Sequence, residues 1–446
     1  MDTPILDFVS AYAESDSLRL HMPGHKGVGP LGIERFDITE IDGADSLYEA
    51  NGIILRSEEN AGKIFGCRTF YSTEGSSLCI RAMIYLIMLY ARQNGKKPLI
   101  AAGRNAHRTF LSAAALIDAD IMWLYPKNGS SYLSCAPDAR ELDEILSNEE
   151  ETPAAVYITA PDYLGNLADI AEIARVCHRH GCLLAVDNAH GAYLKFLGVS
   201  AHPIDLGADI CCDSAHKTLP VLTGGAYLHI SPSAPELFAR QAKNALALFG
   251  STSPSYLILQ SLDLANKYLS GFGRRLGEFL PMVEKLKNEL VLCGYTLCGR
   301  EPLKITVDAK KYGYSGKELA RILAEHNAVC EFADPDYLVL MLTPENGAEG
   351  LQKLREILTA IPRKAPIIDN PPIIQRGEKV LSVRDALLSP SEIVSAEKSL
   401  GRVLASATVG CPPAVPILVS GERIDAHALS CFRYYGTETC EVVCDI

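Results

Sequence analysis

The chain has no long apolar run and no strongly basic segment. Its most apolar stretch, Met83–Tyr90, is far shorter than the ~20 residues that cross a bilayer, so we expect no membrane partner. The start, Met1–Pro4, shows neither the basic region nor the apolar core of a signal peptide, so we expect a cytoplasmic protein. The formal net charge is -12 and no basic stripe stands out, which argues against a nucleic-acid partner.

Paired cysteines at metal-binding spacing are also missing. The 14 cysteines are dispersed and no Cys-x-x-Cys occurs, which argues against zinc ribbons and thioredoxin chemistry and indicates reduced, mostly buried thiols. His21 and His25 stand on either side of Pro23-Gly24, which precludes the helical spacing that metal-binding histidine pairs use. We therefore expect no metal site.

The length and composition predict a globular protein of more than one domain. The chain has 446 residues, of which 48% are hydrophobic and 22% charged. We divide it into an N-terminal segment (1–60), a large domain (61–290) and a smaller C-terminal α+β domain (291–446).

Short apolar strands alternate with periodic helical stretches up to about residue 285. The predicted strands are Pro98–Ala102, Ala154–Thr159, Leu183–Val186 and Ile210–Cys212, and the predicted helices include Ser77–Arg92 and Asp169–His180. Continuous apolar strands joined by helical crossovers indicate an α/β fold with a parallel sheet that is covered on both faces. Further on we expect one long helix near Ser255–Cys293, strands at Lys304–Val307 and Tyr337–Leu342, and helices at Lys317–Glu325 and Pro390–Leu400.

A lysine follows one of these strands and an aspartate follows another. Lys217 stands in Ser214-Ala215-His216-Lys217, and Asp187 ends Ala185-Val186-Asp187. A partly desolvated lysine is more readily a neutral amine that forms a Schiff base, and a carboxylate at a strand end can keep a pyridinium nitrogen protonated. The pair therefore indicates pyridoxal phosphate (PLP) chemistry, whereas a Ser-x-His-Lys string alone would indicate a solvated lysine.

Two further segments fit a flat, phosphorylated ligand. Thr73–Ser77 precedes a helical run, and small and hydroxyl residues at a helix N-terminus can cradle phosphate, although an ordinary N-cap has the same sequence. His107, in Arg104–Thr109, lies at a strand-to-helix junction, where an imidazole can stack on a ring or can cap the helix.

Phosphate loop, histidine, aspartate strand and lysine occur in an order that closely resembles the Orn/Lys/Arg decarboxylase family of fold-type-I PLP enzymes. The similar segments span nearly the whole chain: His21–Gly27, Arg104–Arg108, Val186–Ala192, Ser214–Pro220, Gly250–Tyr256 and Cys411–Ile417. The chain resembles the short form without a wing domain. The resemblance implies a PLP-dependent transferase-like large domain with a mainly parallel sheet, and a smaller C-terminal α+β domain.

The resemblance also implies residue roles. Lys217 would bind PLP covalently, Asp187 would pair with the pyridine nitrogen, and His107 would stack on the ring. Around the phosphate or the Schiff base it places Gly75, Ser76, Ser77, Ser214 and His216, with Ala189 against the opposite ring face and His190 in support. The implied catalytic residues are Lys217, Asp187, His107 and His216. Thr252 would reach a phosphate across a dimer interface, so we expect a homodimer or a larger homo-oligomer.

The expected function is decarboxylation of lysine, arginine or ornithine to a polyamine-type amine and carbon dioxide. Alternatives are another fold-type-I PLP reaction, such as transamination or β-elimination, and a PLP-binding protein with little turnover. Asn188, Tyr193 and Glu74 replace the family's usual Glu, His and Asn, and these departures bear on substrate identity. Glu331 is a candidate partner for the distal cation of the substrate, or else a solvated acid at a strand edge.

Overall fold

The computed structural model of the chain describes residues 1–126, 131–135, 137–149, 151–407 and 413–444. Cys411 and Pro412, which begin the last of the similar segments, lie outside these residues. The chain divides into two compact units, the first formed by Met1–Lys97 with Ile170–Leu276 and the second by Pro98–Asp169 with Gly277–Ile446. The division into three domains stays a prediction.

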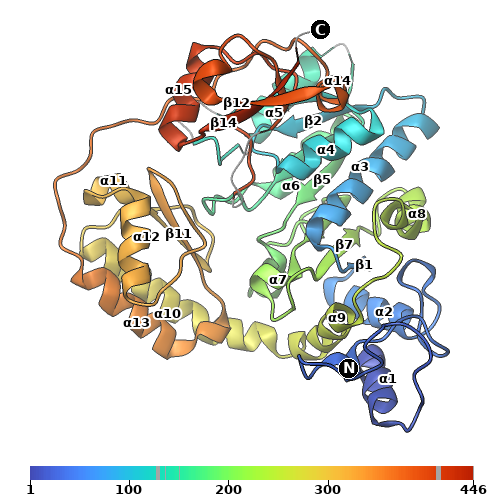
Figure 1. Cartoon of the computed structure of the whole chain (residues 1–446). Coiled ribbons are helices and arrows are strands. Elements are labelled where there is room, and N and C mark those ends of the chain that lie inside the picture. The colour runs from blue at the N-terminus through green and yellow to red at the C-terminus, as the bar shows by residue number, and fades with distance from the viewer. Residues whose placement is uncertain (127–130, 136, 150, 408–412, 445–446) are drawn as a thin grey trace. The chain divides into compact units, whose positions relative to one another are not determined.

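Among the described residues, the first unit contains four strands and seven α-helices. Its strands are β1 (Arg68–Ser72), β5 (Leu183–Asp187), β6 (Ile210–Asp213) and β7 (Ala226–Ile230), of which β1, β5 and β7 are labelled in Figure 1. Its helices are α1 (Pro4–Glu14), α2 (Ile53–Phe65), α3 (Gly75–Gln93), α6 (Ile170–Arg179), α7 (Ala215–Thr218), α8 (Glu236–Ala247) and α9 (Tyr256–Leu269), with 3-10 turns at Glu34–Phe36, Leu47–Glu49 and Ala192–Phe196.

The second unit contains the remaining strands and helices. Its strands are β2 (Leu99–Gly103), β3 (Asp120–Leu124), β4 (Ala155–Thr159), β8 (Leu297–Cys298), β9 (Lys304–Asp308), β10 (Phe332–Ala333), β11 (Tyr337–Met341), β12 (Ser391–Ser395), β13 (Leu404–Ser406) and β14 (Thr439–Val443). Its helices are α4 (Arg108–Ile117), α5 (Ala139–Asn148), α11 (Ala309–Tyr312), α12 (Gly316–Glu325), α13 (Gly347–Ala360), α14 (Val383–Leu388) and α15 (Ala426–Tyr435), with 3-10 turns at Pro344–Asn346 and Ala396–Lys398; α10 (Phe272–Leu292) crosses the boundary in sequence.

The largest sheet has seven strands in the order β1-β7-β6-β5-β4-β2-β3. The pairs β5–β6, β2–β4 and β2–β3 are parallel, whereas β7 is antiparallel to β1 and β6. The strands β5 and β6 are wholly buried, as expected for a sheet covered on both faces. This arrangement confirms the predicted α/β class with a mainly parallel sheet.

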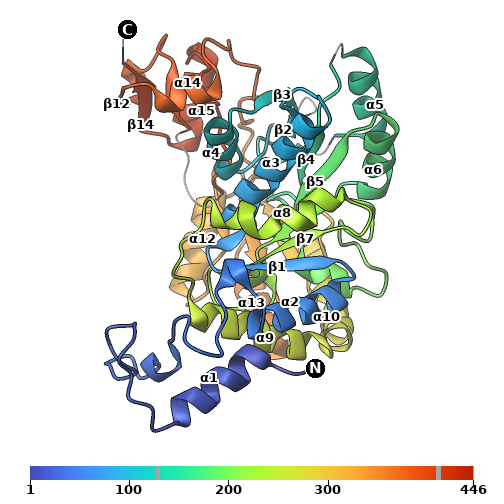
Figure 2. The ribbon, with the colours of Figure 1, turned by 90° about the vertical axis from the view of Figure 1, so that its right-hand side faces the viewer.

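Helices α1, α2 and α9 of the first unit pack against one another (Figure 2). The side chain of Asp263 on α9 accepts hydrogen bonds from the backbone N–H groups of Ile5 and Leu6, at 2.9 and 3.0 Å. These N–H groups lie in the first turn of α1, where no intrahelical carbonyl is available to them. A long-range contact therefore replaces a local cap.

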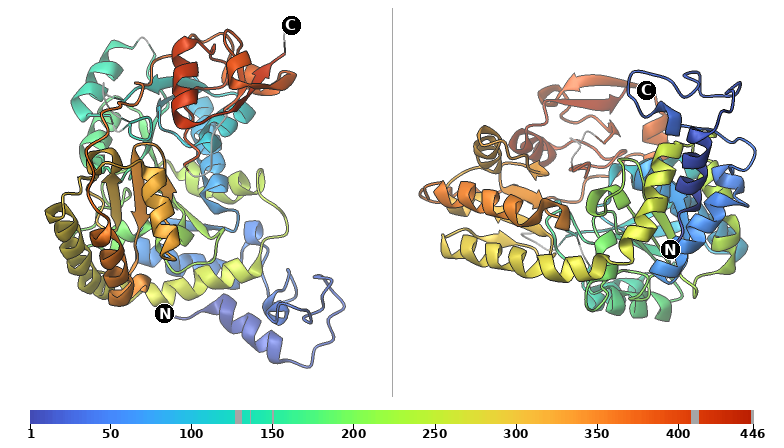
Figure 3. Two further views of the ribbon diagram at one scale, coloured as in Figure 1. Left: turned by 60° about the vertical axis from the view of Figure 1, so that its left-hand side comes forward. Right: turned by 90° about the horizontal axis from the view of Figure 1, so that it is seen from below.

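Two smaller antiparallel sheets lie in the second unit, with the orders β10-β11-β9-β8 and β12-β14-β13. Helices α10 and α13 run side by side beside the first of them (Figure 3). The Arg355 guanidinium of α13 donates to the Glu289 carboxylate of α10, with Nε and Oε2 2.5 Å apart. Both strands predicted after residue 300 are confirmed as β9 and β11, and the predicted helix Lys317–Glu325 is confirmed as α12.

Two predicted helices were wrong. The single helix near Ser255–Cys293 is two helices, α9 and α10, because the chain leaves the helix at Ser270-Gly271 and glycine is a poor helix former. Residues 390–400 hold no α-helix, since Ser391–Ser395 forms β12 and pairs with β14, Ile393 lying opposite Glu441.

None of the helices among the described residues is long and apolar enough to cross a membrane.

Candidate active site

The predicted aspartate and lysine follow neighbouring parallel strands. Asp187, the last residue of β5, pairs with Cys212 of β6. Lys217 lies on the short helix α7 that starts two residues after β6 ends. Because paired parallel strands end at the same sheet edge, both residues lie where α/β sheets bind their ligands.

The amine of Lys217 contacts an imidazole from the segment after β5. Its Nζ is 2.9 Å from Nε2 of His190, a residue only 5% exposed. His190 stands in a turn that is closed by a hydrogen bond from the Gly191 N–H to the Asn188 carbonyl, at 2.8 Å. The turn therefore places an imidazole beside the lysine amine.

The carboxylate of Asp187 is buried, with 2% of the residue exposed. Its Oδ1 accepts from the backbone N–H of Ala189 at 3.2 Å and from the thiol of Cys212 at 3.7 Å. A buried carboxylate is costly unless it is paired with a cation or with strong donors. A protonated pyridine nitrogen is a partner of that kind.

The predicted phosphate loop leads into α3, which begins at Gly75 with a φ of 69°. Ser214, before α7, donates from its hydroxyl to the Ser76 hydroxyl at 2.8 Å, which ties this loop to the lysine segment. A Cβ placed on Gly75 would meet no atom within 4 Å, so open space lies beside the helix N-terminus. Ser77 follows in the first turn, and together these residues form an N-terminus suited to an anion.

Glu74 is turned toward the segment around residue 251. Its Oε1 accepts from the Ser251 backbone N–H at 2.6 Å. This backbone donor therefore stabilises the negative charge that Glu74 adds to the loop. Thr252, the next residue, is exposed, and its reach across a dimer interface stays a prediction.

The two other predicted histidines have local partners. His216 is 3.0 Å from the Gly225 carbonyl through Nδ1, which makes that nitrogen the donor. His107 is the N-cap of α4 and accepts through Nδ1 from the Thr109 N–H at 3.1 Å, which leaves the neutral ring's proton on Nε2. His107 lies in the second unit, and its stacking on a ring stays a prediction.

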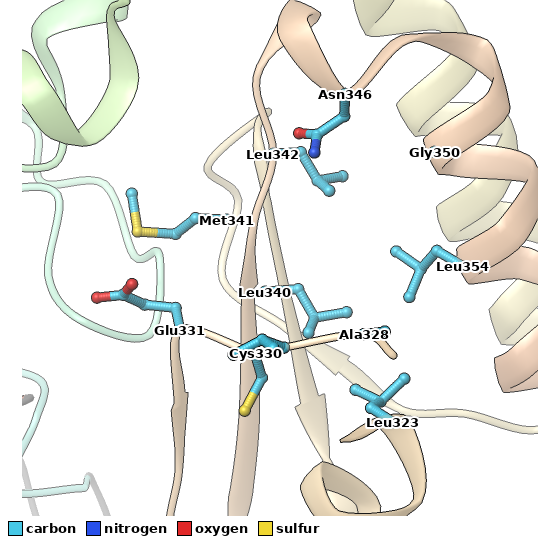
Figure 4. Close-up of a pocket in the computed structure, with 11 residues that line it drawn as sticks. Leu323, Ala328, Cys330, Glu331, Leu340, Met341, Leu342, Asn346, Gly350 and Leu354 are labelled. Carbon is cyan, nitrogen blue, oxygen red and sulfur yellow. The ribbon is translucent and has the colours of Figure 1, made fainter. Parts of the chain in front are cut away.

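Glu331 is one of the residues that line a cavity of the second unit, together with leucines and other polar groups. The cavity has a volume of about 310 Å³ and is lined by Leu323, Ala328, Val329, Cys330, Glu331, Leu340, Met341, Leu342, Asn346, Gly350 and Leu354. Figure 4 shows the Glu331 carboxylate pointing away from the leucines of this cavity, and its Oε1 accepts from the Tyr163 hydroxyl at 2.7 Å. The Glu331 carboxylate therefore bonds to Tyr163 and is turned away from the leucines, and recognition of the substrate by Glu331 stays a prediction.

Three buried residues behind the strand ends were not expected from the sequence. Asp213 closes β6, and its Oδ2 is 3.1 Å from His202 Nε2 and 3.2 Å from His229 Nε2. None of the three side chains is exposed. The signal was a charged residue at the end of an otherwise apolar strand, directly before Ser214.

The residues of the first unit fit PLP. They supply a lysine amine held by an imidazole, a buried carboxylate at a neighbouring strand end, and a hydroxyl-bearing helix N-terminus with space beside it. These groups match the aldehyde, the pyridine nitrogen and the phosphate of the cofactor.

The model of the major domain of Orn/Lys/Arg decarboxylases matches residues 3–292. The chain belongs to the Orn/Lys/Arg decarboxylase family. It is therefore a PLP-dependent amino acid decarboxylase. The predicted family, enzyme class and cofactor are confirmed.

Relatives and solved structures cover nearly the whole chain. The uncharacterised protein YaaO of Bacillus subtilis is 31% identical over 96% of this chain and 93% of its own length. An arginine decarboxylase of Halalkalibacterium halodurans is 27% identical over 97% of this chain and 93% of its own. The Francisella novicida lysine decarboxylase LdcF has a TM-score of 0.81 at 16% identity, covering 99% of this chain and 81% of that one, which shows the shared fold.

Proposed function

We propose that this decarboxylase acts on a basic amino acid and converts it to the corresponding amine and carbon dioxide, with arginine as the first substrate to test. The observation that carries the proposal is the Lys217–His190 contact beside the buried Asp187, within a chain that matches the family model. Arginine comes first because relatives at 26 to 27% identity over nearly the whole chain are named arginine decarboxylases.

In this proposal PLP, when bound, supplies the ring that accepts the electrons of the broken carbon–carboxylate bond. Lys217 holds the cofactor, and His190 positions its amine. Asp187 keeps a proton on the pyridine nitrogen, while Ser76 and Ser214 bind the phosphate together with the first N–H groups of α3. His107, His216, Ala189 and Thr252 keep the roles that the family resemblance implies.

The test uses purified protein supplied with PLP. Carbon dioxide release is measured separately with arginine, lysine and ornithine, and the visible absorbance of the bound cofactor is recorded. We expect release from one of the three substrates. Lys217→Ala should abolish both the absorbance and the release, because no other amine would then hold the cofactor.

Lys267→Ala is the matched control. Lys267 is an exposed lysine of α9 in the same unit, so its removal should change neither readout. Cofactor absorbance without carbon dioxide from any of the three amino acids would contradict the proposed substrate class. Keto-acid formation would instead indicate transamination.

A further inference from the structure

Asn188 and Asp213 form the next pair beyond the last paired residues of β5 and β6. Asp187 lies opposite Cys212, and the Asn188 backbone N–H donates to the Cys212 carbonyl at 3.0 Å. The Asn188 side chain continues this ladder, since its Nδ2 donates to Asp213 Oδ1 at 2.7 Å. Because side chains alternate along a strand, this bond lies on the sheet face opposite to Asp187 and Cys212.

The carboxylate of Asp213 is fully buried and accepts donors at both oxygens. Oδ1 accepts from Asn188, and Oδ2 is within hydrogen-bond distance of the Nε2 atoms of His202 and His229. Burial raises the pKa of this carboxyl group, but the two imidazoles outweigh burial and hold its pKa far below the usual range. The lowered pKa favours the ionised form of Asp213, and hydrogen bonds to an ionised carboxylate are charge-assisted.

The chemistry of the carboxylate fixes the orientation of the Asn188 amide. A carboxylate only accepts, so the amide must present its NH₂ group to Asp213. The amide oxygen then lies toward Gly191, where an added Cβ would be 2.0 Å from it. Only glycine fits there, and the turn from 188 to 191 that carries His190 is packed directly against the amide.

We propose that Asn188 and Asp213 are positioning residues of the cofactor site, and that their buried hydrogen bond fixes the spacing between Asp187 and the Ser214–Lys217 segment. This inference rests on the proposed function. Each residue is the direct chain neighbour of one that contacts cofactor in that proposal, Asn188 of Asp187 and Asp213 of Ser214. Since both side chains lie behind the strand ends, they act through these neighbours.

The Asp213 carboxylate restricts which side chain fits at position 188. A second carboxylate facing Asp213 in this fully buried place would repel it and would lack a donor. Because residue 213 is an aspartate, the side chain at position 188 must donate a hydrogen bond and must be as long as that of asparagine. Asn188 and Asp213 therefore act as a matched pair.

The test compares PLP affinity with thermal stability in Asn188→Asp, Asp213→Asn and the double variant that exchanges the two side chains. PLP affinity is measured by titrating the visible absorbance, and thermal stability is measured without PLP. We expect Asn188→Asp to raise the Kd for PLP at least ~10-fold, the usual scale for losing a buried charge-assisted bond. The double variant restores a donor and an acceptor at this place and should recover part of the affinity.

Asp209→Asn is the matched control. Asp209 is 4% exposed and precedes β6, at the end of the strand remote from Asp213. Its carboxylate accepts from His178 Nε2 at 2.9 Å and from the Leu184 N–H at 2.8 Å. Its loss should lower the melting temperature without changing the Kd for PLP. If Asn188→Asp and Asp213→Asn also lower only the melting temperature, the pair is merely structural and the proposal is overturned.

Two further outcomes would also overturn it. Ligand atoms of His202, Cys211 and Asp213 lie within 4.8 Å of one another, so stoichiometric metal that elemental analysis finds in the purified protein and loses in Asp213→Asn would make this a metal site. Wild-type protein that shows no cofactor absorbance would refute the proposed function and the inference with it. Absorbance in the wild type with an unchanged Kd in Asn188→Asp would refute the inference alone.

Discussion

At the residue scale, the buried carboxylate of Asp263 joins α1 to the core of its unit. It accepts from the N–H groups of Ile5 and Leu6, and from the Ser57 hydroxyl at 2.5 Å. These donors favour the ionised form, but burial is the larger effect and raises the pKa of Asp263 to about 6. The folded protein therefore binds a proton here that the unfolded chain has released at mildly acidic pH.

This carboxyl group makes stability depend on pH. Its contribution to the free energy of unfolding is fully present below pH 3.8, the value for the unfolded chain, and is lost as pH rises through about 6. A shift of this size corresponds to roughly 3 kcal/mol. Urea unfolding at pH 4 and at pH 7 should show a smaller pH effect in Asp263→Asn, because an amide does not titrate.

Some pH dependence should remain in that variant. Burial also raises the pKa of Asp334, in the second unit, to about 6, with the same sign. Asp263→Asn should therefore reduce the pH effect without removing it. An unchanged difference between the two pH values would contradict the assignment to Asp263.

At the element scale, α12 shows how local sequence and burial agree. Ser315 accepts from the Glu318 N–H at 3.2 Å, and the Glu318 carboxylate accepts from the Ser315 N–H at 2.7 Å. This capping box satisfies two donors that the first helical turn leaves unpaired. Leu319 and Leu323 then bury the inner face of the helix.

Removing this cap should destabilise the protein without affecting catalysis. Ser315→Ala is expected to lower the free energy of unfolding by about 1 kcal/mol, the usual value of an N-cap hydroxyl. Urea denaturation measures the change, and Ser315→Thr, which keeps a hydroxyl, is the control. Equal losses in the two variants would show that something other than the cap is responsible.

At the scale of the whole molecule, exposed apolar side chains gather in the N-terminal segment. Leu18 and Leu20 are each 81% exposed, Val28 is 80% exposed and Leu31 is 77% exposed. Single exposed apolar side chains are common on protein surfaces, whereas several that stand close together mark a surface where another protein can bind. They are consistent with the predicted homodimer, in which a second copy of the chain would cover this segment.

Sedimentation velocity tests the dimer. We expect the wild-type protein to sediment as a dimer or larger assembly, and Leu20→Asp with Leu31→Asp to shift it toward monomer. Leu292→Asp, at a leucine that is 86% exposed on α10, is the control and should leave the assembly unchanged. A monomeric wild-type protein would contradict the prediction.

The sequence alone determined the parts that depend on local order. Apolar strands that alternate with helices predicted the mainly parallel sheet, and the strands before Asp187 and Lys217 placed both residues at strand ends. The family followed from motifs whose residues stand close together in the chain. These features need only short-range periodicity and known chemistry.

Only the tertiary structure decided which distant groups meet. The predicted helix at 390–400 is the strand β12 because its partner, β14, lies some fifty residues further on and pairing overrides local propensity. The Glu74 carboxylate accepts a hydrogen bond from the Ser251 N–H. The Asp213 carboxylate is within hydrogen-bond distance of the side chains of Asn188, His202 and His229. A buried charge takes its partners from whatever the fold brings within hydrogen-bond distance, and no local pattern records that.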